Sequence, residues 1–497
     1  MKTFHKKHIT KKNSFLKVFG TFIILLIALF GFISLEASGS FFNGINKPKT
    51  QKVITKDEDG NEIVVEKEIP DTVTFLLVGR GGIGNDAPEL TDTIIVAKLN
   101  KQTKDISLLS IPRDLFVVYK NVDGAGRRSK INAIYANDLR GAGTERKAMN
   151  VLIDKIEQIT GEKIDFFANV DFRGFKEIIN TLGGIEIDVP KRLVDYKYPT
   201  EDWKYETVIF DKGKQTMNGD RALKYARSRH STSDYDRSLR QQLVIQAIKN
   251  KVASTYLLTS PEKIGELYKV FDKNIFTNVG VNDAIQLILG IDVFNADFQF
   301  MSSNMNDSCY PGATNCKKGG IIYPASKEAF GGQAVSLFSD ATPSTISTFK
   351  LSKKYSNVAL NYPKVSTENY KIRIINATKY RGVAYKLYFP IKRYGFNLDY
   401  TDFARGAEKP LQTSKIYYHG IAKDSQTLKA LQTFFKGEFK QVEKEQFPEI
   451  KKSNTSKKSQ KTTQNTTKTD EKNIKQEAVI EIVIGNDYIA DKSIFTF

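Results

Sequence analysis

The sequence predicts an α/β or α+β domain in which helices cover a central sheet. Apolar runs of strand length stand at 72–79, 93–99 and 106–111. Further along, apolar residues recur every three or four positions in 145–160, and Gly161 then ends that helical pattern. Strand and helix patterns alternate after this point, which is typical of a sheet with helices packed on its faces.

The remaining elements follow in order. A strand at 163–170 precedes a helix that ends at Gly183-Gly184, and IEIDV at 185–189 is a strand again. Helices are expected at 217–230 and 236–254, and 255–300 also reads as helical. We expect an irregular region at 301–368, then a strand at 371–378, a helix to about Tyr394, and a last strand at 478–485 that needs a sheet to join.

Length and composition narrow the class of protein. At 497 residues the chain predicts two or three domains. Much of the net charge of +19 lies in two tails, six lysines without an acid in 1–17 and eight lysines against two acids in 451–476. The basic charge is therefore not a nucleic-acid-binding face. Two cysteines exclude a disulfide scaffold, and four histidines argue against a multi-histidine metal site.

An uncharged apolar run occupies 18–35, about the minimum length for a bilayer core. Lysines precede it and Glu36 is the first charge after it, so the N-terminus is expected in the cytoplasm and the C-terminal bulk outside the cell. We therefore predict a single-pass anchor in the cell membrane, followed by a polar stalk at 36–69. A cleaved signal peptide, with a small-residue site at 37–39, is the alternative.

Two other segments carry expectations of their own. Cys309 and Cys316 lie in a loop rich in turn residues, and outside the cell a local disulfide between them is favoured over a zinc site. The tract at 451–476 has no apolar face and is predicted to be disordered.

A glycine pattern, Gly79-x-Gly81-x-x-Gly84, follows the first strand. A dinucleotide site requires a helix next, but a strand follows here, so we reject that interpretation. A glycine-rich turn, or a loop whose amides approach phosphates, remains.

Arginines and acids form the chemical inventory. Arg113 ends a strand, Arg227 and Arg229 stand two apart, and Arg237 lies four before Gln241 on one helix, with Arg240 one step round. Such a set suits a diphosphate, although solvated helix faces are the plain alternative.

Acids accompany the arginines. Asp92 follows the glycine loop, and Asp234 and Asp236 precede the arginine-bearing helix. Carboxylates with arginines and Mg²⁺ are the inventory of phosphoryl transfer. Helix capping by Asp234 or Asp236 is the alternative.

Six motifs in order and spacing resemble the LytR-CpsA-Psr family of cell-wall glycopolymer ligases. They are LLVG with LTDTIIV, LLSIPRDLFV, SKINAIYA, DFRGFKEIINTLGGIEIDV, GKQTMNGDRALKYARSRH and DYDRSLRQQ. The resemblance implies a three-layer α/β/α-type domain with a central mixed sheet at 70–300, enclosing a pocket for a polyprenyl chain. It also implies transfer of a phosphoglycan from a polyprenyl-diphosphate lipid to peptidoglycan, with Mg²⁺ on the diphosphate.

The resemblance assigns roles to single residues. Asp92 corresponds to the Mg²⁺-associated acid, Arg113 to a catalytic and diphosphate-binding arginine, and Asp234 to a candidate acid that orients or deprotonates the acceptor hydroxyl. The remaining diphosphate-binding positions correspond to Arg227, Arg229, Arg237, Gln241, Lys130 and Asn132.

This chain departs from the family at one position. The acid expected shortly after the first strand is replaced by Gly81. Asp86 is the candidate replacement metal ligand, and Arg80 could instead contact phosphate. Residues 369–490 resemble the family's C-terminal accessory domain, interrupted by the tract at 451–476 and joined to the first domain through 301–368.

Three other functions stay open at this point. Water in place of the sugar hydroxyl would give a polyprenyl-diphosphate hydrolase. A membrane-bound regulator without enzymatic activity and a wall-binding protein that grips anionic polymer are the non-enzymatic alternatives.

Overall fold

The computed structural model describes residues 50–56, 62–68, 71–141, 143–200, 204–228, 234–254, 261–280, 283, 299–306, 320–398, 407, 409–443 and 479–496. The predicted anchor at 18–35, the loop with Cys309 and Cys316, and the tract at 451–476 lie outside these residues. Among the helices described, none combines the length and hydropathy needed to cross a membrane. The chain divides into two compact units, 1–157 with 163–304 and 158–162 with 305–497.

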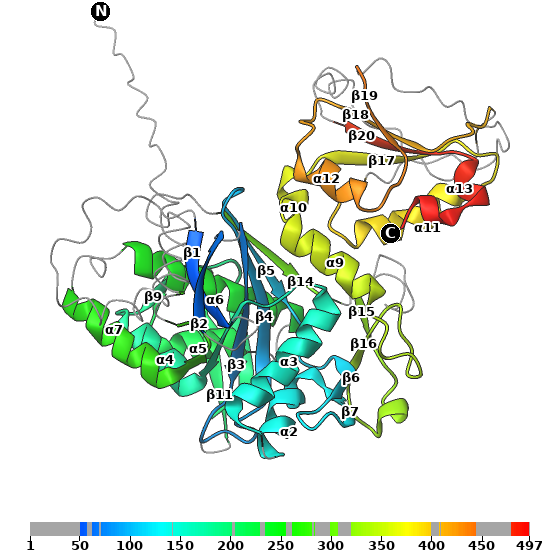
Figure 1. The fold of residues 1–497 in the computed structure, drawn as a ribbon. Coiled ribbons are helices and arrows are strands. Elements are labelled where there is room, and N and C mark those ends of the chain that lie inside the picture. Colours follow the sequence, from blue (N-terminus) through cyan, green and yellow to red (C-terminus); the bar gives the residue numbers. More distant parts are fainter. Residues whose placement is uncertain are drawn as a thin grey trace, which may run out of the picture. The chain divides into compact units, whose positions relative to one another are not determined.

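The first unit is built around a six-stranded mixed sheet (Figure 1). Its strand order is β13 (Ile275–Thr277), β8 (Phe166–Asp171), β3 (Thr72–Arg80), β4 (Thr91–Asn100), β5 (Asp105–Ser110) and β14 (Gln299–Asn304). The pairs β3–β8 and β5–β14 are parallel, whereas β4 runs antiparallel to both β3 and β5. The predicted mixed central sheet is therefore confirmed.

Helices cover both faces of this sheet. Successive side chains of a strand point to opposite faces, so each strand presents side chains to both layers of helices. On one face Arg146 of α3 (Glu145–Thr160) lies 5.2 Å from the ring centroid of Phe167. On the other face Ile245 of α6 (Asp234–Ser254) packs on the cluster that contains Phe75. The same side carries α4 (Phe172–Thr181), α5 (Gly219–Arg227) and α7 (Pro261–Asn274).

Short elements complete the first unit. Two-stranded sheets join β1 (Thr50–Lys56) with β2 (Glu62–Glu68), β6 (Phe116–Lys120) with β7 (Gly126–Lys130), β9 (Ile185–Val189) with β12 (Gly213–Met217), and β10 (Leu193–Pro199) with β11 (Tyr205–Phe210). The short helices are η2 (Ile131–Ala133) and α2 (Ile134–Arg140).

The second unit has its own sheet, in the order β17 (Lys371–Asn376), β20 (Val479–Ile484), β18 (Lys415–His419) and β19 (Glu438–Gln441). Every residue of β20 is buried, and the strand lies between β17 and β18. The last strand of the sequence thus finds the sheet that it needs. The other elements are β15 (Ile322–Pro324), η5 (Glu328–Phe330), β16 (Ser336–Phe338), α9 (Lys350–Asn361), α10 (Val365–Glu368), α11 (Val383–Lys392), α12 (Gln426–Gln432), α13 (Asp487–Ala490) and η8 (Lys492–Ile494).

Two expectations need correction, and one further segment contains elements that were not predicted. The segment 255–300 is not helical throughout, since β13 and the start of β14 fall within it. The segment 301–368 is not irregular throughout, since it holds α9 and a small sheet. The segment 36–69 contains the β1–β2 hairpin. Strands of three residues, such as β13, β15 and β16, have too few positions to show an alternating pattern above the background.

Candidate functional site

The ends of four strands place the predicted site at one edge of the first unit's sheet. Strands β3, β5 and β8 run in the same direction, so their carboxyl ends lie at that edge. The antiparallel strand β4 begins there, with Thr91 opposite Arg80. Residues far apart in sequence, such as Asp92, Arg113 and Asp171, therefore come to the same edge.

A chain of alternating charges occupies part of this edge. Arg113 donates from Nη1 to Asp92 Oδ1 at 2.8 Å, and its Nε lies 3.6 Å from Asp114 Oδ2. Lys130 Nζ donates to Asp114 Oδ1 at 2.8 Å, and Asn132 Nδ2 lies 3.4 Å from Asp92 Oδ1. Four predicted residues meet here, and Asp114, to which the sequence assigned no role, links two of them.

The local fold explains why these side chains meet. Lys130 ends β7 and is paired with Phe116, shortly after Asp114. The hydroxyl of Thr91 then donates to the carbonyl oxygen of Asn132 at 3.2 Å, which holds the turn after β7 against the start of β4. Both Thr91 and Asn132 are buried, so the hydrogen bonds fix the positions of Asp92 and Lys130.

The carboxylate of Asp92 has one oxygen engaged and one open. Oδ1 accepts from Arg113 and Asn132, whereas Oδ2 accepts no hydrogen bond within the described part of the chain. No group of three or more His, Cys, Asp or Glu residues that could hold a metal occurs among the described residues. Mg²⁺ commonly uses one or two carboxylates together with substrate phosphates and waters, so a single open Asp92 oxygen fits that ion as a partner of a bound diphosphate.

Arg227, the last residue of α5, contacts two aromatic side chains. Its guanidinium carbon lies 4.3 Å from the ring centroid of Phe172 and 5.5 Å from that of Tyr198. Its Nη1 also lies 3.3 Å from the Tyr198 hydroxyl. Burial raises the pKa of Tyr198, so this hydroxyl stays protonated at neutral pH. The contact with the Phe172 ring and the hydrogen bond to Tyr198 limit the orientations of the guanidinium.

The sequence did not reveal the two aromatic partners. Phe172 lies just after β8, inside the DFRGF motif. A large ring next to the end of a strand could have been recognised from the sequence as a candidate site residue. Tyr198 lies 29 positions before Arg227 on a short strand, and no local pattern connects the two.

The candidate residues on helix α6 differ in how far they are buried. Arg237 is buried and Gln241 is partly exposed. Arg240 is also buried, and it donates to the carbonyl oxygens of Tyr225, at 3.0 Å, and of Ser228, at the end of α5. Arg240 thus ties α6 to α5 and has a structural part.

A buried glutamine brings α6 to the site edge. Gln242 Nε2 donates to Ser110 Oγ at 2.9 Å and to the carbonyl oxygen of Ser303 at 3.2 Å. Ser110 is the last residue of β5, three before Arg113, so the first half of α6 lies by the strand end that Arg113 follows. Arg229 lies outside the described residues, and so does the side chain of Asp234.

Next to Gly81, where the family has an acid, Arg80 faces two acidic side chains. Arg80 is 2.7 Å from Glu89 and 3.9 Å from Glu145, and Glu145 Oε1 accepts from the Tyr135 hydroxyl at 3.2 Å. Because Arg80 faces these two acids, its positive charge is largely neutralised, and little of it is available to bind a phosphate. Burial, followed by the charge of Glu145, raises the pKa of Tyr135.

The glycine loop folds back on itself beside β8. Gly82 has φ +76°, and a Cβ there would lie 2.6 Å from the Asp171 Cβ, so only glycine fits. Asp86 is exposed on this loop, and no hydrogen bond of the described residues joins it to Asp92. The antiparallel strand β4 follows β3, so the strand that was predicted after the glycine pattern is confirmed.

Relatives with curated names cover about half of this chain. A teichoic acid transferase, TagV of Bacillus subtilis, is 30% identical over 274 residues, which are 52% of this chain and 65% of TagV, just under two thirds of its length. A second, TagU of Enterococcus faecalis, is 27% identical over 282 residues, 56% of this chain and 83% of that protein. Both are named polyisoprenyl-teichoic acid–peptidoglycan teichoic acid transferases.

The solved structures include that of TagV from B. subtilis, with 24% identity and a TM-score of 0.42 over 59% of this chain and 98% of TagV. The model of the LytR_cpsA_psr family matches residues 40–330, more than half of the sequence. The chain therefore belongs to the LytR-CpsA-Psr family.

Proposed function

We propose that the protein transfers a glycopolymer from a polyprenyl-diphosphate carrier to a hydroxyl of peptidoglycan. The observation that carries this proposal is the charge cluster at the sheet edge. In it Arg113 lies 2.8 Å from Asp92 and 3.6 Å from Asp114, and Asp114 lies 2.8 Å from Lys130. Relatives named as transferases of polyisoprenyl-linked teichoic acid support the same reaction class.

The reaction is a displacement at phosphorus. The acceptor hydroxyl oxygen bonds to the phosphorus that carries the glycan, and the bond from that phosphorus to the bridging oxygen breaks. Polyprenyl phosphate leaves with the bridging oxygen, and the hydroxyl proton passes to a base, for which we propose Asp234. The product is a phosphodiester between glycan and peptidoglycan.

The protein contributes positioning and charge. The cluster of Asp92, Arg113, Asp114 and Lys130 has no net charge, because two acids face two cations. We propose that Arg113 and Lys130 still donate hydrogen bonds to a bound diphosphate, and that the net positive charge comes from Arg227, Arg229 and Arg237. Gln241 and Asn132 would donate further hydrogen bonds. Mg²⁺ held by Asp92 would supply further neutralisation of the leaving phosphate.

The contacts of Arg227 with Phe172 and Tyr198 serve this positioning. A guanidinium that is already oriented loses less entropy when it binds phosphate oxygens than one on a free side chain. We also propose that the segment 18–35 anchors the chain in the cell membrane, which would place the site outside the cell beside its lipid substrate.

The test uses the full chain in detergent micelles, with a polyprenyl-diphosphate-linked glycan, peptidoglycan fragments and Mg²⁺. Mass spectrometry should detect a phosphodiester-linked product, and Arg113→Ala and Asp92→Asn should each abolish it. The matched control is Arg192→Ala, which breaks an exposed arginine–aspartate pair with Asp211 at 3.1 Å. Free glycan phosphate without a linked product would assign a hydrolase instead, and turnover unchanged in both site variants would refute the site.

A further inference from the structure

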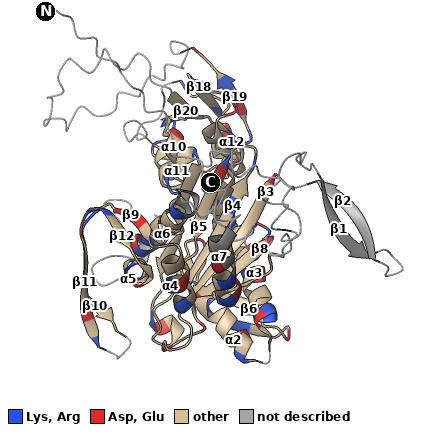
Figure 2. Cartoon of the chain, turned by 90° about the vertical axis from the view of Figure 1, so that its left-hand side faces the viewer, with Lys and Arg blue, Asp and Glu red and all other residues tan. Residues whose placement is uncertain are grey.

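The β10–β11 hairpin of the first unit has an exposed outer face. Figure 2 shows this hairpin projecting beside α5. Exposed and covered residues alternate along β11, and Tyr205, Thr207 and Ile209 lie on the exposed side, with Tyr205 68% and Ile209 41% exposed. Tyr196 is 70% exposed and stands opposite Thr207, in the register shift of β10. Two aromatic rings and one aliphatic side chain are therefore open on one face of a two-stranded sheet.

The register partners of these residues extend the same face. Val194 is paired with Ile209, and Pro199 is paired with Tyr205. Single exposed apolar residues are normal on a protein surface. Here, however, three of the seven large apolar side chains that are exposed among the described residues share one hairpin, which makes them a patch.

The composition of this patch is that of a lipid–water boundary. A tyrosine has an apolar ring and a polar tip, and proteins enrich it at the headgroup level of membranes. Lys197 and Lys204 are exposed on the same hairpin. A lysine can lay its apolar stem along a lipid surface while its ammonium group meets the headgroup phosphates.

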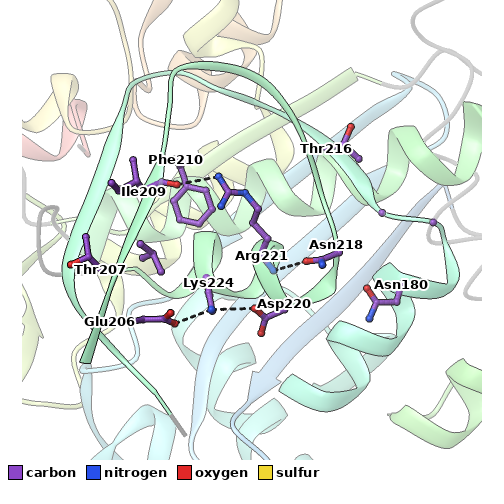
Figure 3. Close-up of a pocket in the computed structure, with 13 residues that line it drawn as sticks. Asn180, Glu206, Thr207, Ile209, Phe210, Thr216, Asn218, Asp220, Arg221 and Lys224 are labelled. Carbon is purple, nitrogen blue, oxygen red and sulfur yellow. Dashed lines mark hydrogen bonds and ion pairs between the residues drawn. The ribbon is translucent and has the colours of Figure 1, made fainter. Parts of the chain in front are cut away.

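The inner side of the hairpin is fixed to α5. Lys224 Nζ lies 2.8 Å from Glu206 of β11 and 3.3 Å from Asp220 (Figure 3). Arg221 donates to the carbonyl oxygen of Ile209 at 3.1 Å. These groups line a cavity of about 700 Å³ beside α5, in which two acids balance two cations. Because ion pairs and a hydrogen bond join the two elements, the position of the hairpin follows that of α5.

The same inner side reaches the candidate site through Tyr198. This residue is buried although it stands two positions after the exposed Tyr196, because the register shift adds a residue to β10. Its hydroxyl lies 3.3 Å from Nη1 of Arg227, at the end of α5. Since packed sheets lie about 10 Å apart, a surface that covers the outer face would lie roughly 10 Å from the layer that holds Arg227.

That separation suits a lipid-linked diphosphate. A polyprenyl-diphosphate carrier keeps its chain in the hydrocarbon and its diphosphate in the headgroup layer, which is about 5–8 Å thick on each side of a bilayer. Tyrosines within that layer would hold Arg227 at or just above its outer limit, where the diphosphate meets water. Arg227 could then reach the diphosphate without removal of the lipid from the membrane.

We propose that the outer face of the β10–β11 hairpin lies on the lipid bilayer and sets the height of Arg227 above it. Tyr196, Tyr205 and Ile209 are the bilayer-contacting residues. The proposal rests on the proposed transferase function, whose donor is a membrane lipid. The turn between the strands contains acids at 201 and 202, which oppose deep insertion, so the contact is at headgroup level.

The only tryptophan of the chain, Trp203, provides the test. It lies between β10 and β11 in sequence, two positions and at most about 7 Å from Tyr205, so tryptophan emission reports on this hairpin alone. The full chain is reconstituted in phospholipid vesicles whose acyl chains are brominated near the headgroup, where bromine quenches tryptophan on contact. Wild-type emission should fall, and the pair Tyr196→Ser with Tyr205→Ser should abolish most of this loss. Sedimentation with vesicles would not suffice, because the proposed anchor at 18–35 would bind them by itself.

Transfer kinetics give a second readout. In the serine pair, kcat/KM for a donor embedded in vesicles should fall about tenfold, because two rings no longer leave water on docking. With a short-chain, water-soluble donor in micelles it should stay within about twofold of the wild type. Tyr196→Phe with Tyr205→Phe keeps both rings and should retain the quenching. The matched control is Tyr380→Ser with Tyr385→Ser, two exposed tyrosines of the second unit.

Quenching needs no donor, so it separates this proposal from the proposed function. If bromine quenches the wild type and not the serine pair while no donor is turned over, the docking face stands and the transferase falls. Wild-type emission that bromine leaves unchanged, or equal quenching in the wild type and the serine pair, would overturn the proposal. Equal losses of transfer from the embedded and the soluble donor would overturn it too. Dimers in micelles that the serine pair dissociates, without quenching in vesicles, would assign the face to a second copy instead.

Discussion

The two rings around Arg227 give a prediction that depends on the tertiary structure alone. Substituting Phe172 by leucine removes the face that lies 4.3 Å from the guanidinium carbon and keeps the side chain apolar. Tyr198 remains, at 5.5 Å from the same carbon. Arg227 would then keep its charge but lose the nearer of its two stacking partners.

The size of the effect follows from the strength of cation–π contacts. A partly buried contact contributes about 1–2 kcal/mol. If that energy orients Arg227 for the transition state, kcat/KM falls by about 5- to 30-fold in Phe172→Leu, since 1.4 kcal/mol corresponds to a factor of ten. Phe172→Tyr retains the aromatic face and should stay within about threefold of the wild type.

The assay is formation of phosphodiester-linked product under conditions below saturation. Phe175→Leu is the matched control, because Phe175 lies nearly one turn further on α4 and packs on the core cluster. In an Arg227→Ala background Phe172→Leu should add nothing, as a double-mutant cycle requires. A Phe172→Leu enzyme with wild-type kcat/KM and intact melting temperature would refute the reasoning.

Three further predictions concern stability. Gln242→Ala should destabilise the protein by about 1–3 kcal/mol in chemical unfolding, because Ser110 loses a buried partner, whereas Gln241→Ala should lower transfer without changing the midpoint. Arg240→Met should cost about 2–3 kcal/mol in the same assay, since two carbonyl oxygens at the end of α5 lose their donor. Burial lowers the pKa of Lys155 from 10.5 to about 8, so the unfolded chain binds more protons between these values and the contribution of Lys155 to stability rises with pH across that window. Lys155→Met should therefore stabilise the fold at pH 7 by about 1–3 kcal/mol, a gain that shrinks above pH 8 in melting curves; equal gains at pH 7 and pH 10 would contradict this.

Long and strongly patterned elements were readable from the sequence. The helix at 145–160 and the strand at 185–189 have the predicted bounds, because each shows its period over its full length and is followed by a stop signal or a clear boundary. The strands β13 and β14 were read as helical, because β13 has only three residues and β14 does not alternate between buried and exposed positions. The hairpin β10–β11 left no signal at all.

Some residues of the candidate site were likewise predicted from the sequence, and others were not. The family motifs identified Asp92, Arg113, Lys130 and Asn132, and the structure brings these four together. Asp114 escaped attention because an acid beside an arginine is common on any surface. Gln242 and Gln241 are adjacent and chemically identical, and only the direction of the side chain distinguishes the buried one.

The sequence by itself determined the family, the mixed α/β class and most of the charged residues at the sheet edge. Those follow from local periodicity and from motifs, which depend on near neighbours in the chain. Only the tertiary structure decided that Arg227 contacts Phe172 and Tyr198, that Arg240 ties two helices, and that a charge-balanced cavity lies along α5. Each of these depends on contacts between residues twelve or more positions apart, and no local pattern encodes which distant side chains will meet.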